Sequence, residues 1–332
     1  MSGTERRVNA ATAPGPLSPT EEIGFSSRGG TRLHGEYFAF QGDRIAPSPD
    51  DRVAHPETRS SREGSNNPTR SAPRAAALIV HGYFEHAGRY REVAHVLVRA
   101  GLAAMSFDLR GHGRSEGQRG YVDTFDDYLD DLDAALGELD RRIEAACPGQ
   151  SIPRLLLGHS NGALIVLRAL ADPSRSMPPI GAAVLSSPFL GLRVKAPAIQ
   201  DILGRAAGRL LPRLSLPNPL AVEELTHDPE KQEERRLDTL CHESANARWY
   251  ASALDTHDYV LENAARITVP TLWLVADGDR VADPAVSRAT RARIRAPSRY
   301  VPLPGMHHEV FNELERERVF RVLTTYIEDA FP

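Results

Sequence analysis

The chain has 332 residues, of which 41% are hydrophobic and 25% charged, and its formal net charge is −4. It is long enough for one large core with a sub-domain or for two ordinary domains, and its composition is that of a globular protein. The slightly acidic balance provides no basic field that would attract nucleic acid or an anionic membrane. The two cysteines, Cys147 and Cys241, lie in no zinc-ligand or disulfide pattern, so we expect free thiols in a reducing compartment.

The N-terminal region predicts neither a membrane segment nor a secretory signal. No run of residues approaches the roughly 18 apolar residues that cross a bilayer, and the residues after Arg6 and Arg7 lack the apolar stretch of a signal peptide. We therefore expect a cytoplasmic protein. Residues 1–20 are small, polar and proline-containing, and they bury too little apolar surface to become ordered, so they predict a disordered leader.

The next segments predict a pair of strands followed by a long insert. Residues 23–25 and 33–40 have the pattern of short strands, joined by a turn at residues 28–30. Residues 41–74 are rich in Pro, Ser, Arg and Asp, which predicts a flexible insert exposed to solvent. Inserts of this composition more often bind nothing than serve as binding sites.

From Ala75 onward, apolar runs alternate with patterns of helical spacing, which predicts strands and helices in alternation. Continuous apolar strands separated by helices are typical of the α/β class, with a mostly parallel central sheet and helices on both faces. We expect residues 21–188 and 267–332 to form the two parts of this core. The predicted strands are residues 76–80, 102–107, 155–157, 180–185, 271–275 and 299–303, and the predicted helices are residues 90–99, 125–143, 163–170 and 311–327.

Residues 189–266 interrupt this alternation and predict an inserted helical cap. Apolar residues recur at helical spacing between Ile199 and Leu211, while Arg205, Arg209 and Arg213 fall off that stripe. An insertion that leaves the carboxyl ends of parallel strands lies above the ligand-binding edge of the sheet. The apolar stripe fits packing on the sheet domain, or else contact with a membrane or lipid aggregate.

Ser160 is the candidate nucleophile. It lies in the pentapeptide Gly158-His159-Ser160-Asn161-Gly162, between the apolar run 155–157 and the apolar-faced helix 163–170. A buried strand that turns sharply into such a helix holds a serine hydroxyl exposed at its apex, as in the nucleophile elbow of the α/β-hydrolase fold. The two glycines fit this turn because close backbone contacts leave no room for a Cβ atom.

A serine hydroxyl needs a base to take its proton and a carboxylate to orient that base, and in this fold they follow in the order serine, acid, histidine. Asp279 is the favoured acid, because it lies just after the strand 271–275. Asp277 and Asp283 are the alternatives in the same loop.

His308 is the favoured base, because it lies in the loop between the strand 299–303 and the last helix, and His307 is its alternative. We expect no metal at these adjacent histidines, because no carboxylate stands at ligand spacing from them. The chemistry requires no cofactor.

The negative charge that develops on an attacked carbonyl oxygen needs fixed hydrogen-bond donors. The backbone N–H of Asn161, the residue after the nucleophile, is the first candidate. The loop after the strand 76–80 supplies the second, for which we choose the backbone N–H of Tyr83.

Several segments together resemble the monoacylglycerol lipase and lysophospholipase branch of the serine α/β-hydrolases. They are residues 81–90, 107–117, 158–162 and 186–188, with Asp279 and His308 in their loops. The resemblance spans about residue 21 to the C-terminus and is weakest in the predicted cap. It implies hydrolysis of a monoacyl ester through an acyl-enzyme, with an apolar acyl channel under the cap. Tyr83, Phe84 and Asn161 depart from the small residues and the methionine of many relatives, and the 41–74 insert is longer than their usual turn.

The sequence therefore predicts a serine hydrolase of monoacylglycerol-like or lysophospholipid-like esters. An amidase or peptidase, or a general carboxylesterase, would use the same three residues. A non-catalytic binding protein of this fold is disfavoured, because all three residues are present. The predicted partners are a small acyl ester and, in transient contact with the cap, lipid aggregates. Nucleic acid is not among them, and the sequence indicates no oligomeric state.

Overall fold

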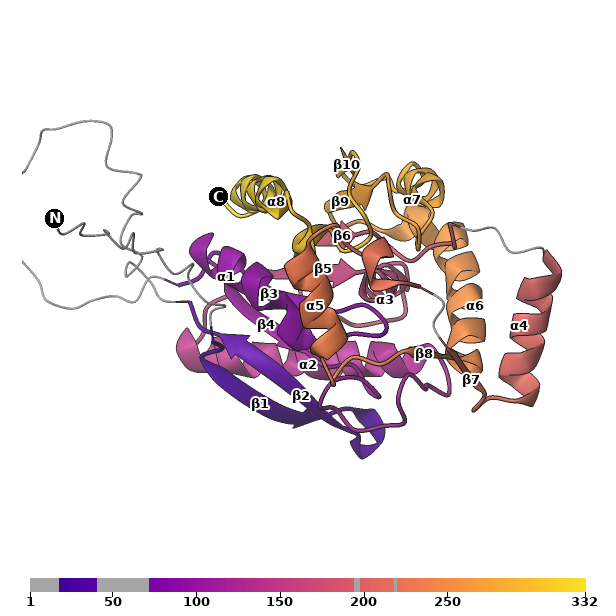
Figure 1. Ribbon diagram of the computed structural model, residues 1–332. Coiled ribbons are helices and arrows are strands. Elements are labelled where there is room, and N and C mark those ends of the chain that lie inside the picture. The colour runs from indigo at the N-terminus through magenta and orange to yellow at the C-terminus, as the bar shows by residue number, and fades with distance from the viewer. Residues whose placement is uncertain (1–17, 41–71, 194–197, 218–219) are drawn as a thin grey trace, which may run out of the picture.

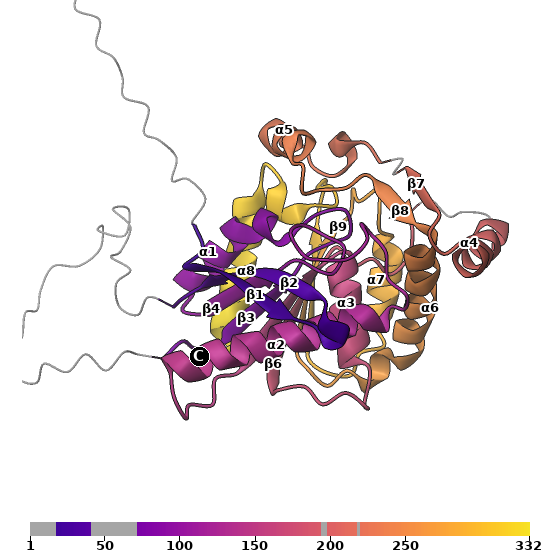
Figure 2. The same cartoon turned by 90° about the horizontal axis from the view of Figure 1, so that it is seen from below.

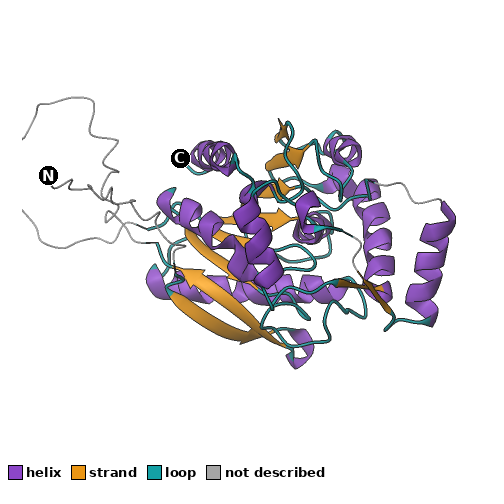
Figure 3. Ribbon diagram, viewed as in Figure 1, coloured by secondary structure: helices purple, strands orange, loops and turns teal. Residues whose placement is uncertain are grey.

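The computed structural model describes residues 18–40, 72–193, 198–217 and 220–332, without the side chains of residues 198–203. A sheet of eight strands forms the centre of this part of the chain, with helices packed against both faces (Figures 1 and 3). The predicted α/β-hydrolase fold is confirmed. Most of the predicted leader 1–20 and of the predicted insert 41–74 lies outside the described residues.

The strand order in the sheet is β1-β2-β4-β3-β5-β6-β9-β10. β1 pairs antiparallel with β2, and β2 pairs antiparallel with β4, whereas all the other neighbours are parallel. The strands of this sheet are β1 (Glu21–Ser26), β2 (Arg32–Phe38), β3 (Ala76–Val80), β4 (Ala103–Phe107), β5 (Arg154–His159), β6 (Ile180–Ser186), β9 (Thr271–Ala276) and β10 (Ser298–Leu303).

The central strands β3, β4 and β5 are buried along their whole length. Successive side chains of a strand point to opposite faces, so alternate residues of these strands enter two separate apolar cores. Helices α1 and α8 close one core, and α2 and α3 close the other. The helices of the whole described chain are α1 (Arg91–Arg99), α2 (Asp126–Ala146), α3 (Asn161–Leu170), α4 (Ala198–Leu210), α5 (Pro229–Leu237), α6 (Ala247–Asn263), α7 (Pro284–Arg291) and α8 (Arg316–Ala330). None of these helices is long and apolar enough to pass through a membrane.

The chain between β6 and β9, which we call the inserted segment, contains α4, α5, α6 and the short strands β7 (Ser215–Pro217) and β8 (Ser244–Asn246). Helix α6 packs against α3. Helix α4 lies on the outer side of α6 (Figures 1 and 2). The two backbones approach closely at Gly208, where an added Cβ would lie 2.5 Å from the Cβ of Ala251. The apolar stripe of α4 fitted packing on the sheet domain, but it is α6 that packs on the core, and α4 packs on α6.

The prediction of a last helix over residues 311–327 is wrong for its first residues. A single 3₁₀ turn, η7 (Val310–Asn312), is followed by a break, and α8 begins only at Arg316. The break lies at Glu313, whose buried carboxylate accepts hydrogen bonds from the backbone N–H groups of His227 at 3.1 Å and His307 at 2.7 Å. Its backbone is extended, with φ −78° and ψ 162°.

The turn from β5 into α3 is tightly packed. Ser160 has φ 52° and ψ −115°, a strained conformation for a residue with a side chain. A Cβ on Gly162 would lie 2.1 Å from the carbonyl oxygen of Val80, and a Cβ on Gly158 would lie 2.6 Å from the Cα of Ala163. The first turn of α3 can therefore reach the end of β3 only because residue 162 has no side chain.

Replacing this glycine tests the packing. We expect Gly162→Ala to lower the free energy of unfolding by about 1–3 kcal/mol or more, because backbone atoms must move to admit the methyl group. Gly137→Ala is the matched control, since Gly137 lies in α2 with nothing within 4 Å of an added Cβ, and it should stabilise by about 0.5–1 kcal/mol. Urea unfolding of both variants measures the difference. Equal stabilities would contradict the packing constraint.

Candidate active site

Ser160 stands at the carboxyl edge of the sheet, at the apex of the turn between β5 and α3. Its backbone is fixed on both sides: the N–H donates to the carbonyl of Ser186 at 2.9 Å, and the carbonyl accepts from the N–H groups of Leu164 and Phe189, each at 3.1 Å. The residue is 8% exposed and lines a cavity of about 900 Å³. The hydroxyl is therefore held at the wall of a space large enough for a small-molecule ligand.

Asp279 and His308 meet beside this cavity. The Nδ1 atom of His308 lies 2.7 Å from Oδ2 of Asp279, and both side chains are buried. The other carboxylate oxygen accepts the backbone N–H groups of Val281 at 2.7 Å and Ala282 at 2.9 Å. Because a carboxylate accepts hydrogen bonds, Nδ1 of His308 carries the proton and Nε2 is left as the basic atom.

The alternatives considered for the acid and the base have other partners. Asp277 accepts the backbone N–H of Gly305 at 2.6 Å, and Asp283 caps α7 by accepting the N–H of Ala285 at 2.9 Å. The Nδ1 atom of His307 donates to the backbone carbonyl of Glu223 at 3.0 Å. The structure thus pairs Asp279 with His308 and directs these three side chains elsewhere.

The electrostatic surroundings of His308 favour its protonated form. Burial alone lowers the pKa of His308, but the charge and hydrogen bond of Asp279, with smaller contributions from Glu309 and Glu85, raise that pKa above its ordinary value of 6.5. The neighbouring His159, whose ring centroid lies 4.8 Å from that of His308, behaves in the opposite way. Burial, and then the proximity of His308, lower the pKa of His159 to about 4, so it is neutral near pH 7.

The cavity above these groups is lined mainly by apolar side chains. They come from both the core and the inserted segment, which together enclose the space. Its apolar and aromatic lining residues include Phe84, Phe189, Leu192, Leu214, Leu216, Leu225, Trp249 and Val281, while Ser160 and His308 line the same cavity. Such a surface suits a hydrocarbon chain better than a charged ligand.

Tyr83 and Asn161, the candidate backbone donors, both contact Trp249. The Tyr83 ring stacks on Trp249 with centroids 3.5 Å apart, and its hydroxyl donates to the carbonyl of Gly120 at 2.5 Å. The Asn161 side chain accepts the indole N–H of Trp249 at 3.3 Å. Asn161 is the first residue of α3, a position whose N–H has no intrahelical acceptor. Trp249 was not foreseen, because it comes from the inserted segment.

A buried ion-pair network that the sequence analysis missed supports the loop after β3. Glu85 accepts the backbone N–H of Gly82 at 2.7 Å and the hydroxyl of Tyr90 at 2.6 Å. Arg89 donates to Glu85 at 3.1 Å and to Glu309 at 2.5 Å. Since Glu309 directly follows His308, one guanidinium joins the loop of Tyr83 to the loop of His308. In the sequence, the i,i+4 spacing of Glu85 and Arg89 within residues 81–90 is the pattern that could have indicated this ion pair.

Comparison with known proteins gives consistent matches. A family model described as "Serine aminopeptidase, S33" matches residues 71–315. A monoacylglycerol lipase of Mycolicibacterium smegmatis is 32% identical over 257 residues, covering 77% of this chain and 88% of that protein. The phospholipase YtpA of Bacillus subtilis is 28% identical over 256 residues, covering 76% and 95%.

Solved structures agree with these matches. The crystal structure of a monoacylglycerol lipase from Paleococcus ferrophilus superposes with a TM-score of 0.69 at 29% identity, covering 78% of this chain and 96% of that one. The resemblance noted in the sequence is thereby confirmed. The chain belongs to the serine aminopeptidase S33 family and has the α/β-hydrolase fold of the monoacylglycerol lipases that it resembles.

Proposed function

We propose that the chain hydrolyses carboxylic esters of the monoacylglycerol or lysophospholipid type through an acyl-enzyme on Ser160. The observation that carries this proposal is the hydrogen bond between Asp279 and His308, because His308 lines the same large apolar cavity as Ser160. Monoacylglycerol lipase and phospholipase are the activities named for two of the similar proteins. The proposal includes the cytoplasmic location inferred from the sequence and the assignment of residues 189–266 as a cap.

In the first half of the reaction, the Ser160 hydroxyl attacks the ester carbonyl while Nε2 of His308 takes its proton. Asp279 accepts the Nδ1–H of His308, which keeps Nε2 free as the base, and it stabilises the imidazolium that forms. The oxyanion accepts hydrogen bonds from the backbone N–H groups of Tyr83 and Asn161. When the intermediate collapses, the C–O bond of the ester breaks and His308 returns its proton to the departing alcohol.

In the second half, water attacks the acyl-serine and His308 takes a proton from that water. The collapse of the second tetrahedral intermediate breaks the bond to Ser160, releases the carboxylic acid and returns a proton to the serine oxygen. The free hydroxyl of Ser160 is thus regenerated, and water is the only co-reactant.

The charges around the cavity favour an ester over a peptide with a free amino terminus. An aminopeptidase has to bind the substrate's ammonium group, which calls for an available carboxylate. Among the described residues that line the cavity, the carboxylates are Glu85 and Glu309, and both form ion pairs with Arg89. Both carboxylates are therefore already engaged by a cation of the chain itself, which supports an uncharged acyl ester as substrate.

Replacing the nucleophile tests the proposal directly. We expect Ser160→Ala to reduce kcat for a medium-chain p-nitrophenyl ester by about 10⁴-fold or more, because no acyl-enzyme can form. Labelling by a fluorophosphonate probe should disappear together with the activity. Ser174→Ala, on an exposed turn, is the control and should retain both. Turnover retained by a folded Ser160→Ala protein would sink the nucleophile assignment, and a faster rate on a matched anilide would favour the amidase alternative.

The surroundings of His308 predict how the rate depends on pH. Only the neutral imidazole accepts the serine proton, so activity is lost as the pH falls through the pKa of His308, which lies above 6.5. The acid limb of kcat/KM against pH should therefore have its midpoint above 6.5. In Asp279→Asn the residual activity should show a lower midpoint, because the charge that raises the pKa is gone. A wild-type midpoint below 6.5 would contradict the assigned ion pair.

Exposed leucines near the cavity mouth support transient contact of the inserted segment with lipid aggregates. Leu214 and Leu216 line the cavity and are still 39% and 58% exposed. Leu210 and Leu211, at the end of α4, are 79% and 59% exposed. A cluster of exposed apolar side chains next to a cavity for an acyl chain suits an interface with aggregated lipid.

A double replacement tests this contact. We expect Leu210→Ser with Leu211→Ser to lower the rate on micellar monoacylglycerol several-fold, while the rate on a soluble short-chain ester stays the same. Leu237→Ser is the matched control, because Leu237 is 71% exposed in the inserted segment but lines a different cavity. Comparable losses on both substrates would show that the double variant damages the site itself, and unchanged micellar rates would exclude the contact.

A further inference from the structure

Trp249 of α6 lines the cavity beside the candidate nucleophile, although α6 belongs to the inserted segment. The indole N–H donates to the side chain of Asn161 at 3.3 Å, and Asn161 directly follows Ser160 in the chain. The indole also lies nearly parallel to the ring of Phe189, with centroids 5.9 Å apart and planes inclined by 14°. The backbone N–H of Phe189 in turn donates to the carbonyl of Ser160 at 3.1 Å. Two immediate neighbours of the nucleophile therefore hold the indole.

The third partner of the indole comes from the loop after β3. The ring of Tyr83 stacks on the indole, with centroids 3.5 Å apart and planes inclined by 13°. The preceding residue, Gly82, passes close to the nucleophile, since a Cβ added to Gly82 would lie 3.3 Å from the Cβ of Ser160. The side chains of both candidate oxyanion donors, Tyr83 and Asn161, thus converge on one indole. The indole therefore borders the space in which the proposed reaction places the ester carbonyl.

The stacked pair of Tyr83 and Trp249 is fixed by hydrogen bonds at both rings. Trp249 is 4% exposed, and its backbone N–H donates to the side chain of Asn246, the residue that caps α6, at 3.3 Å. The hydroxyl of Tyr83 donates to the carbonyl of Gly120 at 2.5 Å and accepts the backbone N–H of Asn246 at 3.2 Å. One residue, Asn246, thus binds to both partners of the stack. Neither ring can move away from the other without breaking these hydrogen bonds.

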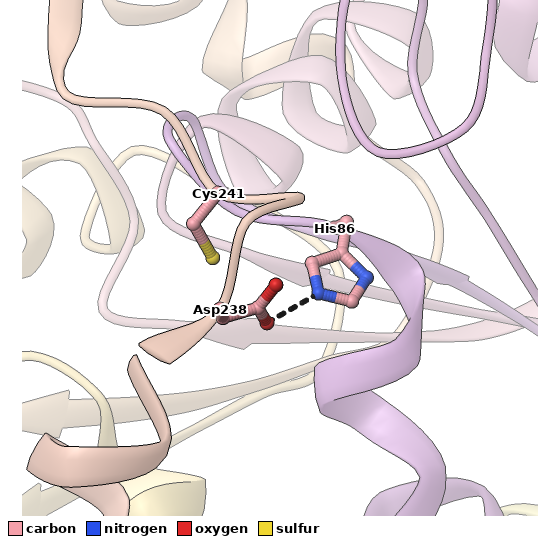
Figure 4. Close-up of side chains that lie close together, drawn as sticks. All are labelled: His86, Asp238 and Cys241. Carbon is pink, nitrogen blue, oxygen red and sulfur yellow. Dashed lines mark hydrogen bonds and ion pairs between the residues drawn. The ribbon is translucent and has the colours of Figure 1, made fainter. Parts of the chain in front are cut away.

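A second contact attaches the same loop to the inserted segment (Figure 4). The Nε2 atom of His86 lies 2.7 Å from Oδ2 of Asp238, and the side chain of Cys241 lies beside this hydrogen-bonded pair. The loop after β3 therefore meets the inserted segment at Tyr83 and again three residues later. Because the loop is held at both places, the indole of Trp249 is a rigid part of the cavity wall.

The surface around the indole suits the acyl side of an ester better than the alcohol side. Phe84 and Phe189 line the same cavity, and their ring centroids lie 6.4 Å and 5.9 Å from that of Trp249. Aromatic surface favours hydrocarbon over the hydroxyl groups of a glycerol. The first carbons of an acyl chain are therefore the part of the substrate that we expect against this wall.

We propose that Trp249 is a specificity-determining residue, which confines the space at the reacting carbonyl and makes the chain selective for acyl groups that are unbranched at the carbon next to the carbonyl. Closely packed rings yield little, so a methyl branch at that carbon has to displace the indole from its partners. Discrimination by one methylene-sized group in an apolar pocket is typically about 10–200-fold in kcat/KM. This inference rests on the proposed function and specifies which acyl groups the same site accepts.

The rates of hydrolysis of three matched esters test the inference. They are propyl hexanoate, its derivative with a methyl branch at the first acyl carbon, and isopropyl hexanoate, which is branched on the alcohol. The wild type should prefer the unbranched to the acyl-branched ester, in kcat/KM, at least about tenfold more than hydroxide ion does in alkaline hydrolysis. Trp249→Ala should reduce that preference at least about tenfold, and Trp249→Phe, which keeps a ring against Tyr83, should reduce it several-fold.

Val260→Ala is the matched control, because Val260 is buried in the same helix α6 but is not among the described residues that line the cavity. It should keep the wild-type preference. An unchanged preference in the folded Trp249 variants would overturn the inference, and so would a gain confined to isopropyl hexanoate, which would place the indole at the alcohol. Failure of the wild type to hydrolyse any of the three esters would instead refute the proposed function. Far-ultraviolet circular dichroism confirms the fold of each variant, and Trp249→Phe decides the outcome where Trp249→Ala does not fold.

Discussion

The contact between the first turn of α3 and the end of β3 is the constraint on which the candidate site depends. Because Gly162 has no side chain, the carbonyl oxygen of Val80 occupies the space that a Cβ would need. Helix α3 can therefore begin directly at the sheet, and Ser160 takes a strained backbone conformation at its carboxyl edge. β5 lies in the middle of the parallel strands, so the loops after β3, β6, β9 and β10 all end near this serine.

The cavity beside Ser160 is mostly apolar although its wall contains buried charges. Arg89 pairs with both Glu85 and Glu309, and these two residues are the carboxylates among the described residues of the cavity wall. An unpaired buried carboxylate would be costly and would attract cations into the space. Because both carboxylates are hydrogen-bonded to one guanidinium, the rest of the cavity presents mostly apolar surface. Asp279 is the hydrogen-bonded partner of His308.

The fold was predictable because local patterns determine its elements. Apolar runs predicted the strands, and apolar residues at helical spacing predicted the helices. Ser160, Asp279 and His308 each follow a predicted strand, which indicated that the three side chains would share one edge of the sheet. The features that escaped prediction depend on partners distant in the sequence. The predicted last helix is interrupted at Glu313, whose carboxylate accepts the N–H of His227, 86 residues away. The same contact brings the ring of His227 against that of His307, with centroids 3.7 Å apart, which the sequence spacing did not indicate.

The inserted segment is not an independent lid, because its polar contacts end on the loops that carry the candidate groups. The N–H of Asn246 donates to the hydroxyl of Tyr83 at 3.2 Å, and Asp238 pairs with His86 three residues further along the same loop. On the other side, the N–H of Glu309 donates to the carbonyl of Leu225 at 2.8 Å. Displacing this part of the segment would therefore disturb the loops of Tyr83 and His308 together. Helix α4 lies outside α6 and carries the exposed Leu210, and its Arg205 forms ion pairs with Asp255 and Asp258 of α6. A lipid surface could thus engage α4 while the geometry around Ser160 stays intact.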